Sequence, residues 1–200
     1  MPNPSMPSSN KQLDGRNRIL DVAEMLFQER GYTAVAMRDI AEALGVRQAS
    51  LYYYFSNKEQ LFVSVRERGF ERHRVGLQTA FARADEELRS QLQAAADWFL
   101  SQPPIKFLGM MQSDMPSLSK EAEQHLSRVS FQSTFVPIMQ IFVVAQANGK
   151  IRNVQPKLLT GFFLSVLESI PFVFKPGETA TKEEMAKEMI SVLLEGIEVR

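Results

Sequence analysis

The fold is decided by residues 31–62, which read GYTAVAMRDIAEALGVRQASLYYYFSNKEQLF. Four apolar residues in the first half of this stretch have the spacing of one helical face: Met37, Ile40, Ala41 and Leu44. Gly45 ends that face, and a second short helix is predicted over 47–53 with Leu51 facing inward. Two short helices joined by a tight glycine-containing turn form a helix-turn-helix.

One helix is expected before this motif and another after it. Residues 14–30 repeat apolar side chains at helical spacing, with Asp14 as the expected N-cap and Gly31 as the stop. After the motif, Ser56 and Glu59 have the spacing of a capping box. A further long helix is therefore expected to begin at that point.

The remainder of the chain keeps the helical pattern. Apolar positions at helical spacing continue over 61–77, 88–99, 105–111, 119–147, 157–174 and 181–197, and no alternating strand pattern of useful length appears. Pro137 is expected to kink its helix, and Thr181 with Glu184 fits a second capping box. The chain is predicted to be all-α with about nine helices. It comprises a disordered arm over 1–13, a helix-turn-helix domain over 14–60 and a second helical domain over 61–200.

Composition excludes several classes of protein. The 200 residues include no Cys, which excludes a disulfide framework and a cysteine-based zinc site and fits a cytoplasmic protein. The longest apolar stretch, 160–174, contains Glu168 and Pro171, so no clean run of the roughly 18 to 20 residues needed to cross a bilayer is expected. The N-terminus has neither the basic start nor the apolar run of a signal peptide.

Catalytic motifs are missing from the sequence. The ten glycines are never closer than seven residues apart, which excludes a glycine-rich phosphate loop. The two histidines, His73 and His125, lie on separate predicted helices without metal-ligand spacing. We therefore expect no metal, no cofactor and no enzyme activity. Glu168 is the one carboxylate open to a functional interpretation, because burying it unpaired would be costly, but a place at the edge of its apolar stripe or a pair across a subunit contact is the favoured explanation.

The charges balance, with 23 Lys plus Arg against 23 Asp plus Glu, but their positions are uneven. The window 43–58 carries Arg47 and Lys58 and no acid, and it holds the triplet Tyr52–Tyr54. Phenol groups can donate hydrogen bonds to phosphate oxygens, so the window suits an anionic partner such as a nucleic acid. A half-buried helix face would have the same composition.

Residues 16–62 closely resemble the TetR (tetracycline-repressor-like) family of bacterial transcription regulators. The resemblance lies in GYT at 31–33, MRDIA at 37–41, LGV at 44–46, SLYYYF at 50–55, NKE at 57–59 and LF at 61–62. It implies a homodimer with a DNA-binding domain on each subunit, bound to a palindromic operator in double-stranded DNA. It also implies that the helical domain over 61–200 binds a small effector and forms the dimer.

Two positions depart from the habit of this family. Ala36 and Arg47 stand where Ser or Thr usually caps the two helices of the motif, and loss of such a cap costs about 1 kcal/mol of helix stability. Arg47 also places a charge at the leading end of the recognition helix, which normally meets base edges. It therefore either changes the operator preference or contacts a phosphate.

The resemblance and the reach of the side chains give eight candidate DNA-binding residues. Arg47 can fork onto guanine, Gln48 can pair with adenine, and Ser50 can touch either base. The others are expected at phosphate or sugar, although part of the tyrosine triplet must belong to the domain core: Arg38, Tyr52, Tyr53, Tyr54 and Lys58.

Two sets of residues are assigned in the second domain. An apolar effector pocket is expected from its aromatic and methionine side chains, most of which also suit a plain core: Trp98, Phe107, Met110, Met111, Phe131, Phe135, Met139 and Phe163. In this family the last two helices form a four-helix dimer interface, to which the resemblance assigns Phe162, Val166, Ile170, Met189 and Leu193.

The sequence thus predicts a ligand-responsive transcriptional regulator, most often a repressor in this family. A regulator controlled by a protein partner is the alternative, and an enzyme built on the same helices is a weaker one. The helix over 57–83 is expected to link the two domains and to carry the effector's signal. Gly69 and Gly76 within it either let the helix pivot or admit a close neighbour.

Overall fold

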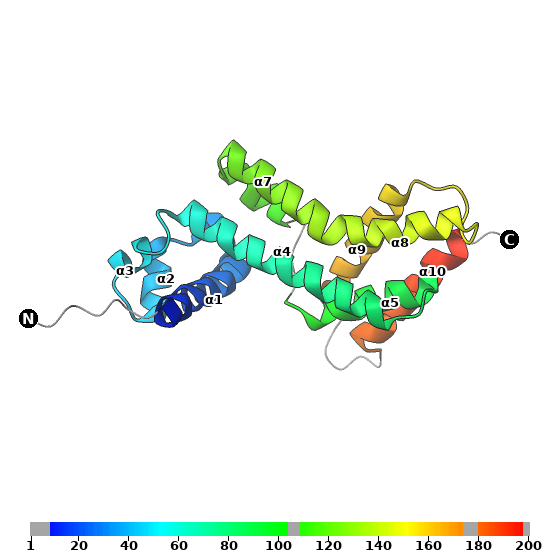
Figure 1. The fold of residues 1–200 in the computed structure, drawn as a ribbon, viewed down its shortest axis with the longest axis horizontal. Helices are drawn as coiled ribbons and strands as arrows, with labels where there is room; N and C mark the ends of the chain where they lie inside the picture. Colours follow the sequence, from blue (N-terminus) through cyan, green and yellow to red (C-terminus); the bar gives the residue numbers. More distant parts are fainter. Residues whose placement is uncertain (1–8, 104–108, 174–179, 198–200) are drawn as a thin grey trace, which may run out of the picture. The chain divides into compact units, whose positions relative to one another are not determined.

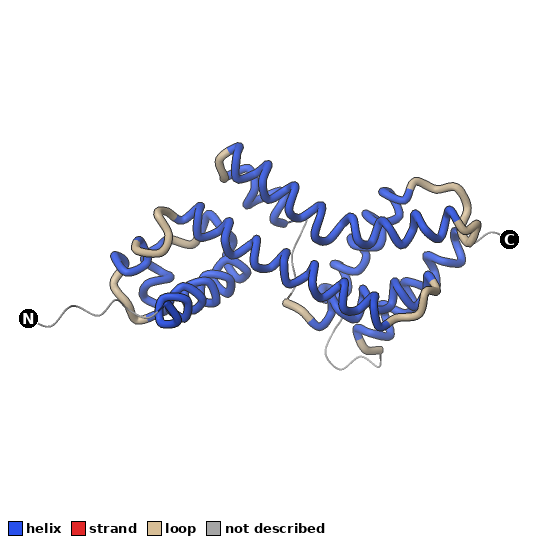
Figure 2. Tube along the Cα trace, viewed as in Figure 1, coloured by secondary structure: helices blue, strands red, loops and turns tan. Residues whose placement is uncertain are grey.

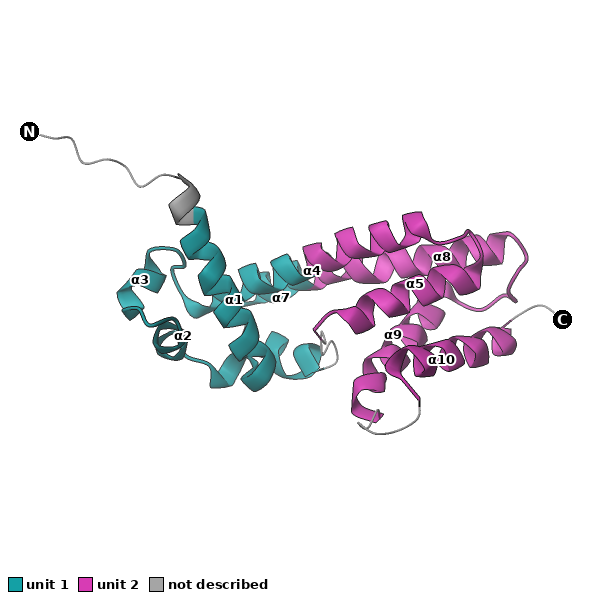
Figure 3. Ribbon diagram, turned by 90° about the horizontal axis from the view of Figure 1, so that it is seen from below, with its two compact units in different colours: residues 1–69, 108–126 teal, residues 70–107, 127–200 magenta. Residues whose placement is uncertain are grey.

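The computed structural model describes residues 9–103, 109–173 and 180–197. Within these ranges the chain is all-α, as predicted, with nine α-helices and no β-strand (Figure 1, Figure 2). It divides into two compact units, which Figure 3 colours separately. Unit 1 comprises residues 1–69 and 108–126, and unit 2 comprises residues 70–107 and 127–200.

Unit 1 contains the helix-turn-helix. Its elements are α1 (Ser9–Ala34), α2 (Met37–Leu44), α3 (Gln48–Tyr52), the first part of α4 (Lys58–Arg83), the π-helical η1 (Met110–Asp114), the 3-10 turn η2 (Met115–Ser117) and the start of α7 (Lys120–Ser130). Gly45 adopts φ 68° and ends α2, as expected of a glycine in the left-handed region. The predicted pair of short helices, α2 and α3, is confirmed.

The start of α1 differs from the sequence prediction. The helix begins at Ser9 rather than at Asp14, so Asp14 does not cap it. Residues 9–13, SNKQL, include no helix breaker, and Lys, Gln and Leu are good helix formers. Residues 1–8 of the predicted disordered arm lie outside the described residues. Gly31 does interrupt the helix, with φ 79° and ψ 168°.

The caps of the helices decide several local details. Asn57, and not Ser56, caps α4: its Oδ1 accepts from the backbone N–H of Gln60 at 2.8 Å. The predicted box of Ser56 and Glu59 is therefore displaced by one residue, and Oε1 of Gln60 accepts from the backbone N–H of Ser56 at 2.6 Å.

At the start of α10 (Lys182–Ile197) the predicted box is confirmed. The backbone N–H of Thr181 donates to Glu184 Oε2 at 2.7 Å, and that of Glu184 donates to Thr181 Oγ1 at 3.1 Å. Both partners of this box were identified correctly from their spacing.

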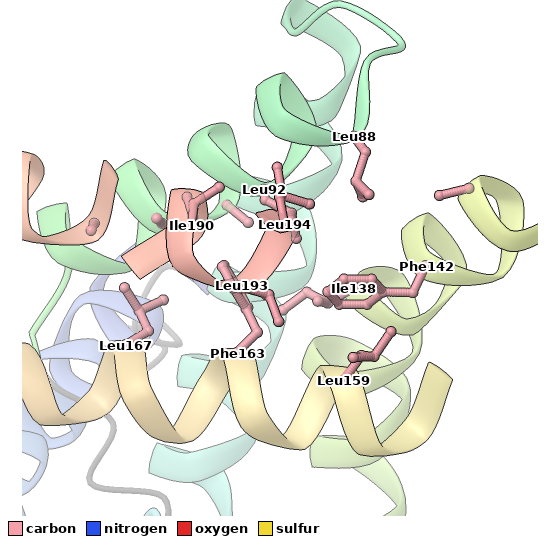
Figure 4. Close-up of a cluster of buried hydrophobic side chains, with 14 of the residues drawn as sticks. Leu88, Leu92, Ile138, Phe142, Leu159, Phe163, Leu167, Ile190, Leu193 and Leu194 are labelled. Carbon is pink, nitrogen blue, oxygen red and sulfur yellow. The ribbon is translucent and has the colours of Figure 1, made fainter. Parts of the chain in front are cut away.

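Unit 2 buries one continuous apolar core. Its elements are α5 (Leu88–Ser101), η3 (Phe131–Phe135), α8 (Val136–Ala147), α9 (Pro156–Val173), α10 and the remaining parts of α4 and α7. Figure 4 shows side chains from α5, α8, α9 and α10 meeting in this core, among them Leu92, Phe142, Phe163 and Leu193. Burial of such side chains is the main driving force for folding.

Pro137 interrupts the long helical region between 120 and 147, as expected. The interruption takes the form of the π-helical turn η3, which ends two residues before the proline. Because proline lacks an N–H and crowds the preceding turn, a wider turn at this place removes the conflict.

Two segments, 120–147 and 156–173, are long and apolar enough to cross a membrane by length and composition alone. The sequence expectation considered only uninterrupted apolar runs and therefore missed them. Core helices of other proteins pass the same test, and both segments supply side chains to the core of unit 2, including Ile138 and Leu167.

Gly76 packs against a neighbour. A methyl group at Gly76 would overlap the six-membered ring of Trp98, whose indole N–H donates to His73 Nδ1 at 3.3 Å. Of the two interpretations of this glycine, close packing is the one with direct geometric support. A Gly76→Ala variant would disturb this packing, so it would not report on pivoting of α4 by itself.

Candidate nucleic-acid interface

The recognition helix α3 is held by one buried residue and presents the rest of its surface to solvent. Leu51 is fully buried and anchors the helix in unit 1. Arg47, Gln48 and Ser50 are all exposed. Arg38, expected as a second anchor for the DNA backbone, is exposed on α2. The predicted base-reading side chains are therefore all accessible to solvent.

The tyrosine triplet is split between solvent and interior. Tyr52 and Tyr53 are 48% and 67% exposed, whereas Tyr54 is half-buried. The hydroxyl of Tyr54 lies so close to Gly15 of α1 that a Cβ there would be 2.5 Å away. A neighbouring contact, with the Arg16 guanidinium 5.2 Å from the ring centre of Phe55, also joins α1 to the end of α3.

Two of the exposed side chains on α3 are joined. Gln48 Nε2 donates to the hydroxyl of Tyr52 at 3.2 Å, four residues along the same face.

The Lys58 side chain turns toward Tyr32, whereas a phosphate contact would need it to point outward. Its Nζ donates to the backbone oxygen of Tyr32 at 2.9 Å and stands 4.1 Å from the centre of that ring. Burial lowers the pKa of the Lys58 ammonium below its usual value. The group acts in this structure as a cap for the end of α1.

A buried carboxylate that the sequence did not reveal holds unit 1 together. Asp114 Oδ1 accepts from the backbone N–H of Tyr32 at 2.9 Å, and its Oδ2 pairs with Arg66 at 3.2 Å. Burial is the largest influence on the pKa of Arg66 and lowers it, while Asp114 acts in the opposite direction. Arg66 also lies 4.9 Å from the ring centre of Phe62, which packs on Tyr32 at 4.8 Å.

Further polar contacts tie the segment around Asp114 to α4. Glu59 accepts from the backbone N–H of Ser119 at 2.6 Å and from its hydroxyl at 2.8 Å. Glu67 pairs with His125 at 2.6 Å. In these contacts and in those of Asp114, the two partners are 48 to 82 residues apart in sequence. The one available signal was an acid, Asp114, among the methionines of 110–115.

The residues expected to form an effector pocket do not share one environment. Met110 and Met111 belong to unit 1, and Phe107 lies outside the described residues. In unit 2, Phe163 is fully buried in the core, whereas Phe131 is exposed and stacks on Phe135 at 5.2 Å. Trp98 is partly buried against the core and Met139 is half-exposed.

A hollow of about 670 Å³ in unit 2 contains none of these predicted pocket residues. It is lined by Glu87, Leu88, Arg89, Ser90, Gly149, Lys150 and Leu194. Within the part of the chain that the structure describes, no group of three or more His, Asp or Glu side chains could hold a metal ion.

The residues expected at a dimer interface separate into two sets. Ile170 and Leu193 are buried in the core of unit 2. Phe162 is 49% exposed, and Val166 and Met189 are partly exposed. An apolar surface therefore exists on α9 and α10, but it is made by other side chains than those facing the core, chiefly Leu158, Phe162, Phe172 and Val192.

Comparison with known proteins matches the N-terminal part of the chain to a family model. Residues 19–65 match the model of the bacterial regulatory proteins of the tetR family. The transcriptional repressor KstR2 of Rhodococcus jostii is 26% identical over 98% of this chain and 97% of the relative.

Solved structures agree with this match. The regulator PfmR of the TetR family, from Thermus thermophilus, is 29% identical with a TM-score of 0.71, covering 91% of this chain and 100% of that one. AibR, solved with isovaleryl coenzyme A and operator DNA, has a TM-score of 0.75 at 23% identity, covering 90% and 98%. At 23% identity, the similarity to AibR shows a shared fold and nothing more.

Replacement of Asp114 by Asn should destabilise the protein strongly. The variant keeps an acceptor for Tyr32 but leaves the buried guanidinium of Arg66 without its counter-charge, which should lower the free energy of unfolding by about 3 kcal/mol. Asp21→Asn is the matched control, because that carboxylate is 67% exposed in its pair with Arg68 and should cost less than about 1 kcal/mol. Urea unfolding of both variants measures the difference, and equal losses would contradict a structural role for Asp114.

Proposed function

We propose that this protein, a TetR-family regulator by its N-terminal domain, represses transcription by binding a palindromic operator as a homodimer. A small apolar effector, bound by residues of the 61–200 region, then releases it from DNA. The observation that carries the DNA-binding part is the exposure of Arg47, which precedes α3, and of Gln48 and Ser50 within it, in a window without acids.

The proposed contacts divide between bases and backbone. Arg47 and Gln48 have the donor and acceptor patterns that suit guanine and adenine in the major groove. Tyr52 and Tyr53 are exposed and can donate to phosphates, as can Arg38. The pair of Arg38 with Glu42, at 3.7 Å and largely exposed, is weak enough to exchange for a phosphate.

The apolar surface on α9 and α10 supports assembly through a second copy. Leu158, Phe162, Ser165, Ser169 and Phe172 recur at intervals of four and three residues and so follow one stripe of α9. A dimer formed there has two-fold symmetry, which a palindromic operator matches. Its two recognition helices would stand about 34 to 36 Å apart, one turn of DNA.

Control by a small molecule is supported by a structural neighbour of this chain. AibR was solved with isovaleryl coenzyme A, a ligand with an apolar acyl group. A regulator controlled by a protein partner is the alternative. A compound that binds the folded protein raises its unfolding temperature by mass action, so a thermal-shift screen of apolar acids and acyl thioesters separates the two. An absence of any shift across the screen favours the protein partner.

An enzyme built on these helices has less support. The relatives matched by sequence are named as transcriptional regulators, and the described residues include no group of three or more His, Asp or Glu side chains that could hold a metal ion. Transcriptional regulation is therefore the function that we propose.

Arg38→Ala should weaken binding to every duplex alike and lower the slope of log affinity against log salt by about one. Lys58→Ala should leave that slope unchanged, since the ammonium is engaged with Tyr32. Fluorescence anisotropy over a salt series, with an operator selected from genomic fragments, measures both. If Lys58→Ala lowers the slope as much as Arg38→Ala does, Lys58 contacts a phosphate and the prediction for it is wrong.

Phe162→Asp should give folded monomers, because it places a charge on the exposed apolar stripe and leaves the core of unit 2 intact. Leu193→Asp should instead unfold the protein, since Leu193 belongs to that core. Sedimentation velocity combined with far-UV circular dichroism distinguishes the outcomes. A Phe162→Asp variant that sediments as an intact dimer would remove α9 from the interface.

A further inference from the structure

We propose that Tyr52 is a positioning residue for sequence readout, which fixes the side-chain amide of Gln48 in the orientation that reads one base pair. The inference rests on the proposed DNA-binding function and adds to it a residue that sets specificity without touching the base.

The geometry of α3 brings the two side chains together. Gln48 is the first residue of the helix and Tyr52 the last, so they lie four residues apart on one face. Nε2 of Gln48 donates to the hydroxyl of Tyr52 at 3.2 Å, and both residues are exposed. Full burial of Leu51 fixes how the helix is rotated, and therefore which face carries this pair.

The hydrogen-bonding capacity of the amide fits this arrangement. A glutamine amide has two N–H donors and one oxygen acceptor. With one donor engaged by Tyr52, the second N–H and the oxygen stay available. Adenine presents an acceptor at N7 and a donor at N6 in the major groove, which needs that remaining pair. Tyr52 therefore occupies the one group that adenine does not require.

The hydroxyl of Tyr52 still has a hydrogen that it can donate to the DNA backbone. A phenol can accept one hydrogen bond and donate another. Because Tyr52 accepts from Gln48, its own hydrogen is left to donate to a phosphate oxygen. One side chain then links a backbone contact, which sets the register, to a base contact, which sets the sequence.

The expected gain lies in orientation rather than in stability. An exposed hydrogen bond of this kind adds little to folding, but it limits the rotamers of a long side chain before DNA arrives. Ordering this side chain before DNA binds should strengthen base preference roughly 3- to 10-fold, which is about 0.7 to 1.4 kcal/mol at 1.4 kcal/mol per factor of ten.

Tyr53 provides a matched control. It follows Tyr52 directly, is 67% exposed, and packs edge-on against Tyr54 with ring centres 5.0 Å apart. Successive helical residues point about 100° apart, so Tyr53 lies off the face shared by Gln48 and Tyr52. A Tyr53→Phe variant removes a phenol hydroxyl of the same chemistry beside the same helix.

The experiment compares binding preferences of the full-length protein over a randomised duplex pool, sequenced before and after retention. The variants are Gln48→Ala, Tyr52→Phe, Tyr53→Phe and the double variant Gln48→Ala with Tyr52→Phe. We expect Gln48→Ala to abolish preference at one position of each half-site. Tyr52→Phe should reduce preference about 3- to 10-fold at that same position, besides a uniform loss. Tyr53→Phe should give a uniform loss alone, and Tyr52→Phe should change no preference once Gln48 is absent.

The outcomes separate the inference from the proposed function. If Tyr52→Phe weakens all sequences equally, as Tyr53→Phe does, Tyr52 is a phosphate contact and the positioning role is overturned. If Gln48→Ala changes no preference, both the positioning role and the base readout by Gln48 fail, while operator binding stands. If the unmodified protein retains no sequence above background, the DNA-binding function itself fails.

Discussion

The carboxylate of Asp114 is the constraint on which unit 1 depends. A buried charge is tolerated only when its oxygens are matched, and here each oxygen has its own partner, Tyr32 N–H and Arg66. Those partners belong to the end of α1 and to α4, the helices that flank the helix-turn-helix. The angle at which α2 and α3 are presented is therefore set in part by Asp114, which lies 70 residues beyond Leu44, the last residue of α2.

The same constraint explains the position of Lys58. Gly31 breaks α1 at φ 79°, which leaves the peptide groups of Tyr32 without their helical partners. Asp114 takes the N–H of Tyr32 and Lys58 takes its C=O, so both sides of this residue are satisfied. A cation that looks suited to phosphate from its sequence position is thus engaged by a backbone oxygen of the protein, whereas Arg38 and Arg47 stay exposed.

Sequence spacing predicted what depends on near neighbours and failed where distant residues meet. The faces of α2 and α3 and the cap at Thr181 follow from periods of three to four residues. No spacing could place Asp114 beside Tyr32. An apolar stripe also does not say which of its edges faces the chain's own core, and for this reason the sequence assigns Ile170 and Leu193 to a dimer interface although the fold buries both in the core of unit 2.

The short length of α3 limits how much free energy a single DNA-binding domain can gain from reading bases. A helix of five residues offers few base-reading side chains, and each good bidentate contact discriminates by only about 1 to 3 kcal/mol. A single DNA-binding unit is therefore a poor selector against the many competing sites of a genome. A second copy doubles the readout only if it is held at a fixed distance, which requires a rigid apolar interface rather than a polar one. In the proposed dimer, the exposed side chains of Leu158, Phe162 and Phe172 would supply the apolar part of such a contact, with Ser165 and Ser169 lying between them on the same stripe.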